Sequence, residues 1–323
     1  MALQLFHTDP AVATETIQAI AELKRARNAV ILAHNYQYAE IQDIADYVGD
    51  SLGLSQVAAT TDADVIVFCG VHFMAETAAI LSPNKTVLLP DPDAGCSLAD
   101  SISVEQLREW KAQHPGAVVV SYVNTTAAVK AESDYCCTSG NAERVIRAIP
   151  ADREILFLPD MYLGSYLRQA TGRDIQVWAG ECHVHAAIKP AMVERMRGEH
   201  PGSEFLIHPE CGCVSSTMYH LAKGTINPEH SHILSTEGMI RHAQQSNATQ
   251  FVVATEIGVL HRMQKANPEK SFLPIDESIS CRYMKMITLD KVLHSLETMS
   301  HRVTVAPELA DRARLAIERM IEL

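Results

Sequence analysis

The chain has 323 residues, of which 47% are hydrophobic and 20% charged, as in globular proteins with room for two or three domains. Its formal net charge of −12 argues against nucleic acid or an anionic membrane as a partner. No apolar run reaches the roughly 18 residues of a membrane span, and residues 14–28 are charged and helix-like rather than a secretory signal. We therefore expect a cytoplasmic protein whose eight cysteines are mostly reduced and available to a metal or cluster.

The first expected element is a helix that Asp9 caps, with Pro10 at its first position, and that ends near Arg27. A pattern of short strands and helices then occurs three times. Each copy has a buried β-branched strand, a helix that starts at a hydroxyl side chain, a second strand, a second helix and a third strand. The opening strands are expected at 29–33, 117–121 and 204–207, the second strands at 65–69, 154–158 and 250–254, and the third strands at 86–89, 175–178 and 272–275.

Strands that alternate with helices predict parallel sheets joined by right-handed crossovers. The expected fold class is therefore α/β, with three similar βαβαβ domains, each a three-layer sandwich, in a pseudo-threefold arrangement around a central cavity. An apolar stripe predicts a packed helix at 307–321. The expected domains are residues 29–112, 113–200 and 201–299, with 1–28 and 300–323 as flanking helices.

Three cysteines occupy equivalent places in the three copies. Each third strand leads through a polar loop to a lone cysteine, namely Cys96, Cys182 and Cys281, at intervals of 86 and 99 residues. Ligands of parallel α/β sheets sit beyond the carboxyl ends of the strands, so we expect the three loops to face one cavity. Three cysteines from distant loops suit an iron–sulfur cluster in which one iron has no protein thiolate. Such an iron can act as a Lewis acid in a dehydration.

Other roles for the cysteines remain open. Structural zinc prefers four ligands at short spacings such as C-x-x-C, which this chain lacks. Any one of the three can instead be a buried structural cysteine. Cys69 is predicted in the core, and the adjacent Cys136 and Cys137 in the core or a loop. Cys211 and Cys213 are rival ligands, because they follow His-Pro-Glu at the end of an expected strand.

Hydroxyl side chains stand where three of the expected helices begin. Backbone N–H groups and the helix dipole favour an anion at such positions, although simple N-capping is the alternative. Three helix N-termini that face one cavity would suit a substrate with several carboxylates and a phosphate. The chain has no GxGxxG motif and no Walker A loop, which argues against a dinucleotide or a nucleoside triphosphate. The hydroxyl residues are Ser51, Ser139, Ser235 and Thr236.

Side chains able to exchange or orient protons follow the strands. Histidine and a desolvated glutamate can give and take protons near neutral pH, although a single histidine is more often structural. Several such groups at strand ends favour a catalytic role. The candidates are Glu210, His34, His185, His208, Tyr36 and Tyr122.

Together these motifs resemble the quinolinate synthase family, iron–sulfur enzymes of de novo NAD biosynthesis. The resemblance runs from residue 33 to residue 284, in the order of the family. It rests on Ala33-His34-Asn35-Tyr36-Gln37, Gly49-Asp50-Ser51-Leu52, Asp93-Ala94-Gly95-Cys96-Ser97-Leu98-Ala99, Tyr122-Val123-Asn124-Thr125, Cys182-His183-Val184-His185, His208-Pro209-Glu210-Cys211, Ser235-Thr236 and Cys281-Arg282-Tyr283-Met284.

The resemblance implies three similar α/β domains around a [4Fe-4S] cluster whose open iron acts as a Lewis acid. It implies a transferase- or lyase-type condensation of iminoaspartate with dihydroxyacetone phosphate to quinolinate, with loss of phosphate and two waters. Cys96, Cys182 and Cys281 would be the cluster ligands. Catalysis would involve Glu210, Tyr36, Tyr122 and His185, and substrate binding would involve His34, Ser51, Tyr122, Asn124, Ser139, His208, Glu210, Ser235 and Thr236.

The resemblance also implies a supplier of iminoaspartate, because that compound is unstable. An aspartate oxidase or dehydrogenase would associate transiently with this protein. The chain departs from the family pattern at Arg282, where proline is frequent, at Ile287-Thr288, and at Gly212-Cys213. Two other functions stay open, an iron–sulfur redox or iron sensor and a zinc-dependent hydrolase. The acidic composition disfavours the first, and the lack of an H-E-x-x-H motif disfavours the second.

Overall fold

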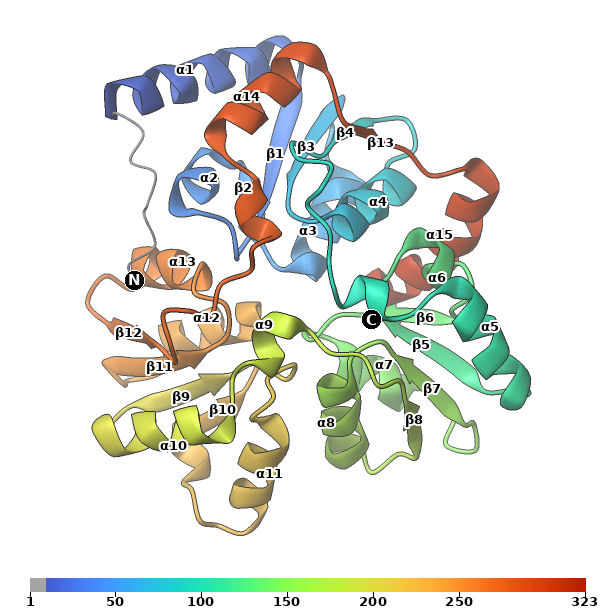
Figure 1. Cartoon of the computed structure of the whole chain (residues 1–323), viewed down its shortest axis with the longest axis vertical. Helices are drawn as coiled ribbons and strands as arrows, with labels where there is room; N and C mark the ends of the chain where they lie inside the picture. The colour runs from blue at the N-terminus through green and yellow to red at the C-terminus, as the bar shows by residue number, and fades with distance from the viewer. Residues whose placement is uncertain (1–9) are drawn as a thin grey trace.

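The computed structural model describes residues 10–323, so the predicted N-cap at Asp9 lies outside the described residues. The chain folds into three α/β units arranged around a common centre (Figure 1). The first unit runs from blue to cyan in the figure, the second is green, and the third runs from yellow to orange. The predicted α/β class with three similar parallel-sheet units is confirmed.

The first unit is built on β1 (Ala29–His34), β2 (Tyr47–Gly49), β3 (Val65–Cys69) and β4 (Thr86–Leu88). Its parallel strands follow the order β2-β1-β3-β4. A late strand, β13 (Arg302–Val303), adds to the β4 edge in the antiparallel direction. Strands β1 and β3 are almost wholly buried, which agrees with their β-branched, apolar composition.

The second and third units repeat this strand order. The second sheet runs β6-β5-β7-β8 and the third β10-β9-β11-β12, and every pairing in them is parallel. The strands of the second sheet are β5 (Val118–Tyr122), β6 (Tyr135–Cys137), β7 (Ile155–Leu158) and β8 (Ile175–Val177). Those of the third are β9 (Glu204–Ile207), β10 (Ser231–Ile233), β11 (Gln250–Ala254) and β12 (Ser271–Pro274).

Each unit therefore contains one more strand and one more helix than the predicted βαβαβ pattern. The additional strands β2, β6 and β10 have three residues each, too few to show a periodic pattern. They lie at the sheet edge beside the opening strand of each unit. The helices between the strands are α2 (Ala39–Ile44), α3 (Ser51–Thr60) and α4 (His72–Leu81), then α6 (Ala127–Lys130), α7 (Ala142–Ala148) and α8 (Met161–Thr171), and finally α11 (Val214–Ala222), α12 (Thr236–Gln245) and α13 (Val259–Ala266).

Beyond the last strand of each unit, the chain forms a cysteine-containing loop, a short helix and a longer helix. The short helices are η1 (Ala99–Ser101), α9 (His183–Ala186) and η3 (Met284–Met286). The longer ones are α5 (Val104–Gln113), α10 (Pro190–Glu199) and α14 (Leu289–Thr298).

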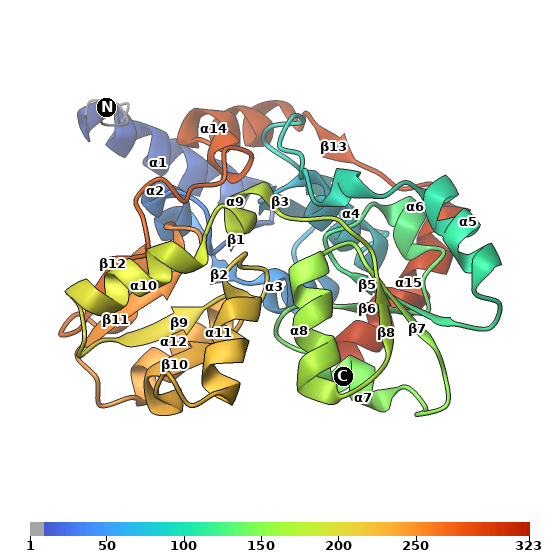
Figure 2. The ribbon, with the colours of Figure 1, turned by 60° about the horizontal axis from the view of Figure 1, so that its bottom comes forward.

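Each of these longer helices packs on the next unit around the centre. Leu107 of α5 joins the apolar cluster formed by β5 and β7, and Met196 of α10 joins that of β9. Helix α14 contacts β3 and α1 (Pro10–Ala26), and so connects the third unit back to the first (Figure 2). The loops that carry the cysteines are therefore the three places where the chain passes from one unit to another.

The last helix, α15 (Pro307–Glu322), packs against α4, α6 and β6, between the first and second units. Its expected apolar stripe is buried at Ala313, Ala316, Ile317 and Met320. Among the described residues, no helix combines the length and the apolar character needed to cross a bilayer.

Candidate metal and substrate site

A cavity lies where the carboxyl ends of the strands of all three units meet. It contains about 730 Å³ of space between atoms, part of which is continuous with solvent. Because the sheets are parallel, the side chains that follow their strands face this common space. The predicted residues that line it are His34, Tyr36, Ser51, Cys96, Tyr122, Asn124, Ser139, Cys182, His185, His208, Glu210, Thr236 and Cys281.

Cys96, Cys182 and Cys281 are all partly buried free thiols of this cavity. Residues next to these cysteines contact one another and so connect the three loops at the rim of the cavity. Ser97 Oγ lies 2.7 Å from His183 Nδ1, and the His183 ring meets the Tyr283 ring edge-on with centroids 5.9 Å apart. Burial raises the pKa of all three thiols, to about 12 for Cys96.

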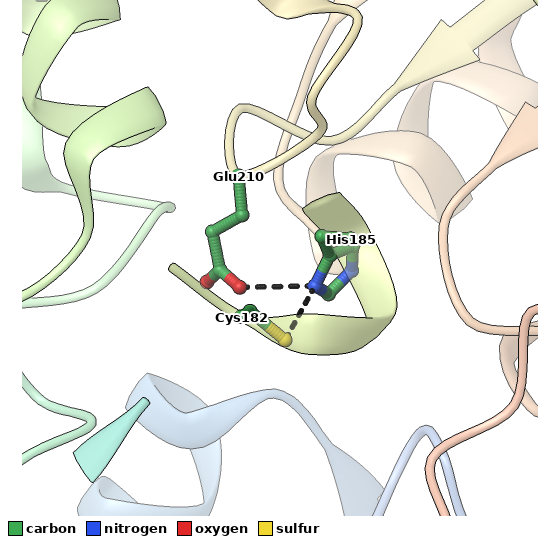
Figure 3. A group of neighbouring side chains, drawn as sticks. All are labelled: Cys182, His185 and Glu210. Carbon is green, nitrogen blue, oxygen red and sulfur yellow. Dashed lines mark hydrogen bonds and ion pairs between the residues drawn. The ribbon is translucent and has the colours of Figure 1, made fainter. Parts of the chain in front are cut away.

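Glu210 is held between a tyrosine and a histidine, and Figure 3 shows the histidine side of this arrangement. Its Oε1 accepts a hydrogen bond from the Tyr122 hydroxyl, and its Oε2 lies 3.0 Å from His185 Nδ1. The same Nδ1 lies 3.3 Å from Cys182 Sγ, and the ligand atoms of Cys182, His185 and Glu210 lie within 4.8 Å of one another. The catalytic candidate Glu210 thus stands directly beside one cysteine.

Glu210 and His185 form a buried ion pair. Burial by itself would raise the pKa of Glu210, but the His185 charge and the hydrogen bonds from His185 and Tyr122 lower it below its ordinary value. Burial would likewise lower the pKa of His185, but the charges of Cys182 and Glu210 raise it. The far nitrogen of His185, Nε2, lies 2.9 Å from Thr255 Oγ1 and 3.3 Å from the Tyr36 hydroxyl, so Tyr36 belongs to the same network.

His34 ends β1 and His208 directly follows β9, so the two occupy similar positions in the first and third units. Each accepts a hydrogen bond at Nδ1 from the backbone N–H two residues later, Tyr36 in one case and Glu210 in the other. Burial lowers the pKa of both imidazoles to about 3, so both are neutral at neutral pH. Because Nδ1 accepts in each neutral ring, the proton lies on Nε2, which can donate a hydrogen bond into the cavity.

The four predicted hydroxyl residues are placed differently. Ser51 and Thr236 line the cavity, and Ser139 Oγ lies 3.2 Å from His208 Nε2. Ser235 is the N-cap of α12 and accepts a hydrogen bond from Gly238 N, which is the simple capping role. It borders a neighbouring hollow rather than the cavity with the cysteines.

Two charged residues of the site were not identified from the sequence. Glu256 lines the cavity directly after β11 and accepts a hydrogen bond from Cys281 N at 3.1 Å. Lys285 Nζ lies 3.2 Å from the same carboxylate and donates to the Tyr36 carbonyl, so it ties the third cysteine loop to the first unit. The available signal was the position of Thr255-Glu256 at the end of a buried strand, the criterion that identified His34 and Glu210.

The remaining cysteines lie away from the cavity. Cys69, Cys136 and Cys137 are buried in the core, as expected for the first and as one of two possibilities for the other two. The rivals Cys211 and Cys213 are joined by a disulfide and packed in the apolar cluster of the third unit. Neither lines the cavity, although Cys182 and Cys281 pack against the same apolar cluster.

Three α/β units around a cavity lined by thiols, histidines and a buried carboxylate are the architecture of an enzyme with a central active site. The family described as Quinolinate synthetase A protein matches residues 18–322. Proteins named quinolinate synthase are similar over nearly the whole chain. The one from Mycobacterium sp. (strain KMS) is 55% identical over 319 residues, covering 98% of this chain and 95% of that protein.

Two relatives from thermophiles show the same extent of similarity. A quinolinate synthase of Thermus thermophilus is 56% identical over 304 residues, 94% of this chain and 96% of its own. That of Pyrobaculum aerophilum is 53% identical over 305 residues, 94% of this chain and 98% of its own. The chain therefore belongs to the quinolinate synthase family, and the predicted family membership and enzyme class are confirmed.

Proposed function

We propose that this protein condenses iminoaspartate with dihydroxyacetone phosphate to form quinolinate, releasing phosphate and two waters, in the biosynthesis of NAD. We further propose that Cys96, Cys182 and Cys281 hold a [4Fe-4S] cluster. The observation that carries the proposal is one free thiol from each unit on a cavity that also holds Glu210, His185 and Tyr122. The family membership supports the reaction.

The donor set fits such a cluster. The thiols are supplied by three separate loops rather than by a short C-x-x-C segment, and three thiolates leave one iron of a four-iron cluster free. They are partly buried, and burial favours their neutral form unless a metal supplies positive charge. When bound, the cluster would supply a Lewis-acid iron that polarises a substrate oxygen.

The side chains around the thiols would bind and orient two anionic substrates. Neutral His34 and His208 can hydrogen-bond carboxylate or phosphate oxygens, and Ser139 is already aligned with His208. Ser51 and Thr236 add hydroxyls at the starts of α3 and α12, where backbone N–H groups favour anions. Asn124 lines the cavity from the second unit and would complete this set. Ser235 would contribute by shaping the start of α12.

Glu210 would be the proton acceptor for carbon–carbon bond formation and ring closure. It is ionised, because His185 and Tyr122 stabilise its negative charge, and it stands within 4.8 Å of Cys182 Sγ. Tyr122 would hold this carboxylate in place by donating a hydrogen bond to it. The other ring nitrogen of His185, Nε2, contacts the hydroxyls of Thr255 and Tyr36. Tyr36 can therefore take part in proton movement along this series of hydrogen bonds.

Iminoaspartate hydrolyses readily, so a flavin-dependent aspartate oxidase or an aspartate dehydrogenase would have to release it close to this protein. The same proposal places the protein in the cytoplasm, where a reducing environment keeps cluster thiolates available.

One experiment separates this function from a redox or iron sensor and from a zinc hydrolase. The protein is purified without oxygen, and iron, sulfide, zinc and the visible spectrum are measured. We expect four irons per chain with broad absorption, followed by quinolinate formation from the two substrates. A colourless, iron-free sample whose stoichiometric zinc has a sulfur neighbour by X-ray absorption would support the hydrolase, with Cys182, His185 and Glu210 as the ligands. Four irons without quinolinate formation would support the sensor.

A pair of cysteine variants tests the ligand set. Cys281→Ala removes one of the three thiols of the cavity, and we expect it to abolish the cluster. Cys213→Ala removes a sulfur that does not line the cavity, and we expect its iron content to match that of the unaltered protein. Iron and sulfide analysis of both variants is the readout, and the opposite result would mean that the third ligand is wrongly assigned.

A further inference from the structure

Glu204, His232 and His242 form a second group of possible metal ligands in the third unit. Glu204 begins β9, His232 lies in β10, and His242 lies late in α12. Glu204 Oε2 is 2.6 Å from His242 Nε2 and 3.5 Å from His232 Nε2. One ligand atom of each lies within 4.8 Å of the others, and the imidazole centroids are 3.9 Å apart. We infer that these residues bind a divalent transition metal of the zinc class.

The ligand types and their spacing fit that metal. Two imidazoles and one carboxylate, with water in the fourth position, are an established donor set for zinc. Bonds of about 2.0–2.1 Å in a tetrahedral site place ligand atoms about 3.3 Å apart. Glu204 and His232 are already close to this separation, at 3.5 Å. Glu204 and His242 are 2.6 Å apart, so the distance between their ligand atoms would have to increase by less than about 1 Å when a metal replaces the proton between them.

Neighbouring groups form hydrogen bonds with two of the three ligands. Ser246 Oγ donates to the other oxygen of Glu204 at 2.7 Å and so orients the carboxylate. The His232 side chain is partly buried. Without metal, His232 Nε2 lies 3.0 Å from the Glu229 carbonyl oxygen. On metal binding, the ring proton would move from Nε2 to Nδ1, and the hydrogen bond to Glu229 would break. The three side chains keep 13–27% of their surface exposed, so a hydrated ion can reach them.

This group is separate from the cavity with the cysteines. Glu204 lies at the amino end of β9, whereas His208 and Glu210 follow its carboxyl end and line the cavity. A metal here would join β9, β10 and α12, and would stabilise the third unit by binding the folded state alone. The inference therefore does not depend on the proposed reaction.

Equilibrium dialysis against rising Zn²⁺ tests it on the anaerobically purified protein, with iron measured in the same samples. We expect one zinc per chain at micromolar free Zn²⁺ and unchanged iron. Glu204→Gln and His242→Gln should each weaken zinc binding by at least about 10- to 100-fold. The control His294→Gln alters an exposed histidine outside the group and should bind zinc normally. Equal zinc affinity in all variants would overturn the inference.

X-ray absorption of the zinc-loaded, unaltered protein gives an independent answer that no variant's folding can affect. Nitrogen and oxygen neighbours at about 2.0–2.1 Å would support the site. Sulfur neighbours at about 2.3 Å would assign the zinc to cysteines and overturn it, as would the failure of zinc to bind at all.

Discussion

Glu210 is the side chain on which most of the active-site network converges. Its two oxygens contact Tyr122 and His185, and both partners are buried with it. A carboxylate held in this way cannot turn toward solvent, so its negative charge faces the cavity and the adjacent Cys182. Such an arrangement is organised before substrate arrives, which is the condition for efficient proton transfer.

Replacing this charge without changing the shape of the side chain should stop the reaction. We expect Glu210→Gln to lower kcat by about 10²- to 10⁴-fold, because the amide cannot accept a proton. Its iron content should stay that of the unaltered protein, since Glu210 is not one of the three thiols. Steady-state assays with iron analysis are the check, and Glu109→Gln on the exposed face of α5 is the matched control. Full activity in Glu210→Gln would refute the role of Glu210.

Lys130 is a fully buried cation that positions another part of the site. Its Nζ donates to the carbonyls of Val123 and Thr125, the two residues on either side of Asn124. It also lies over the Phe73 ring, 5.2 Å from the centroid. Burial lowers the pKa of Lys130, but the two carbonyl oxygens and the face of the Phe73 ring stabilise its charged ammonium group. Lys130 thus fixes the loop that presents Asn124 to the cavity.

Lys130→Met keeps the apolar stem but removes the donor. The Val123 carbonyl keeps the Thr125 N–H as a donor, but the buried Thr125 carbonyl loses its Lys130 partner at a cost of about 1–3 kcal/mol, so the midpoint of urea unfolding should fall clearly. The loop around Asn124 should also lose its position, and kcat/KM should fall by about 10- to 100-fold. Lys189→Met, at an exposed lysine, should change neither quantity. A loss of stability with unchanged kcat/KM would show that Lys130 has no positioning role.

The connecting segments between units explain why the three cysteines line one cavity. Each cysteine lies after the last strand of its own unit and before a helix that packs on the next one. The contacts of Ser97 with His183 and of His183 with Tyr283 then tie these segments together. Arg282, where the family often has proline, stacks on the Tyr283 ring and donates to its hydroxyl, so it supports the same rim.

Helix α15 offers a test of how firmly two units are joined. Ile317 is fully buried on the face that meets the first two units, whereas Leu315 on the same helix is 57% exposed. We expect Ile317→Ala to lower the free energy of unfolding by about 2–5 kcal/mol through lost packing. Leu315→Ala should cost less than about 0.5 kcal/mol. Urea unfolding followed by circular dichroism measures both, and similar values would mean that α15 contributes little to the core.

The whole molecule encloses two neutral histidines at its centre, and this affects its stability in acid. The pKa of His34 and of His208 is about 3 in the folded protein, against 6.5 when exposed. Between these values the unfolded chain binds more protons than the folded one. Their contribution to stability is therefore full above pH 6.5 and is lost progressively as the pH falls toward 3.

The free energy of unfolding should accordingly fall as the pH is lowered from 6.5 to 5, by up to about 1.4 kcal/mol per pH unit for each histidine. Glu210 acts in the same direction only below its ordinary pKa of 4.5, so it does not obscure this range. His208→Gln should show a shallower slope than the unaltered protein, while His294→Gln should keep the full slope. Urea titrations at several pH values are the measurement, and identical slopes in all three proteins would contradict the prediction.

Repetition made much of this molecule predictable from its residues. The opening strands and the three loop cysteines recur at similar intervals, and a parallel α/β arrangement follows from alternating strands and helices. Polar residues directly after buried strands, such as His34 and Glu210, could be assigned to the sheet edge where ligands bind. Tertiary packing is not needed for these conclusions, because they depend only on the order and spacing of residues along the chain.

Other features were settled only by the folded chain. The edge strands β2, β6 and β10 are too short to show periodicity, and they form because a neighbouring strand supplies hydrogen bonds. Glu256 and Lys285 act through partners outside their own segments, which no local pattern contains. The same holds for Glu204, His232 and His242. Local order thus determined the elements and the residue types of the site, whereas contacts between distant segments decided which side chains face one another.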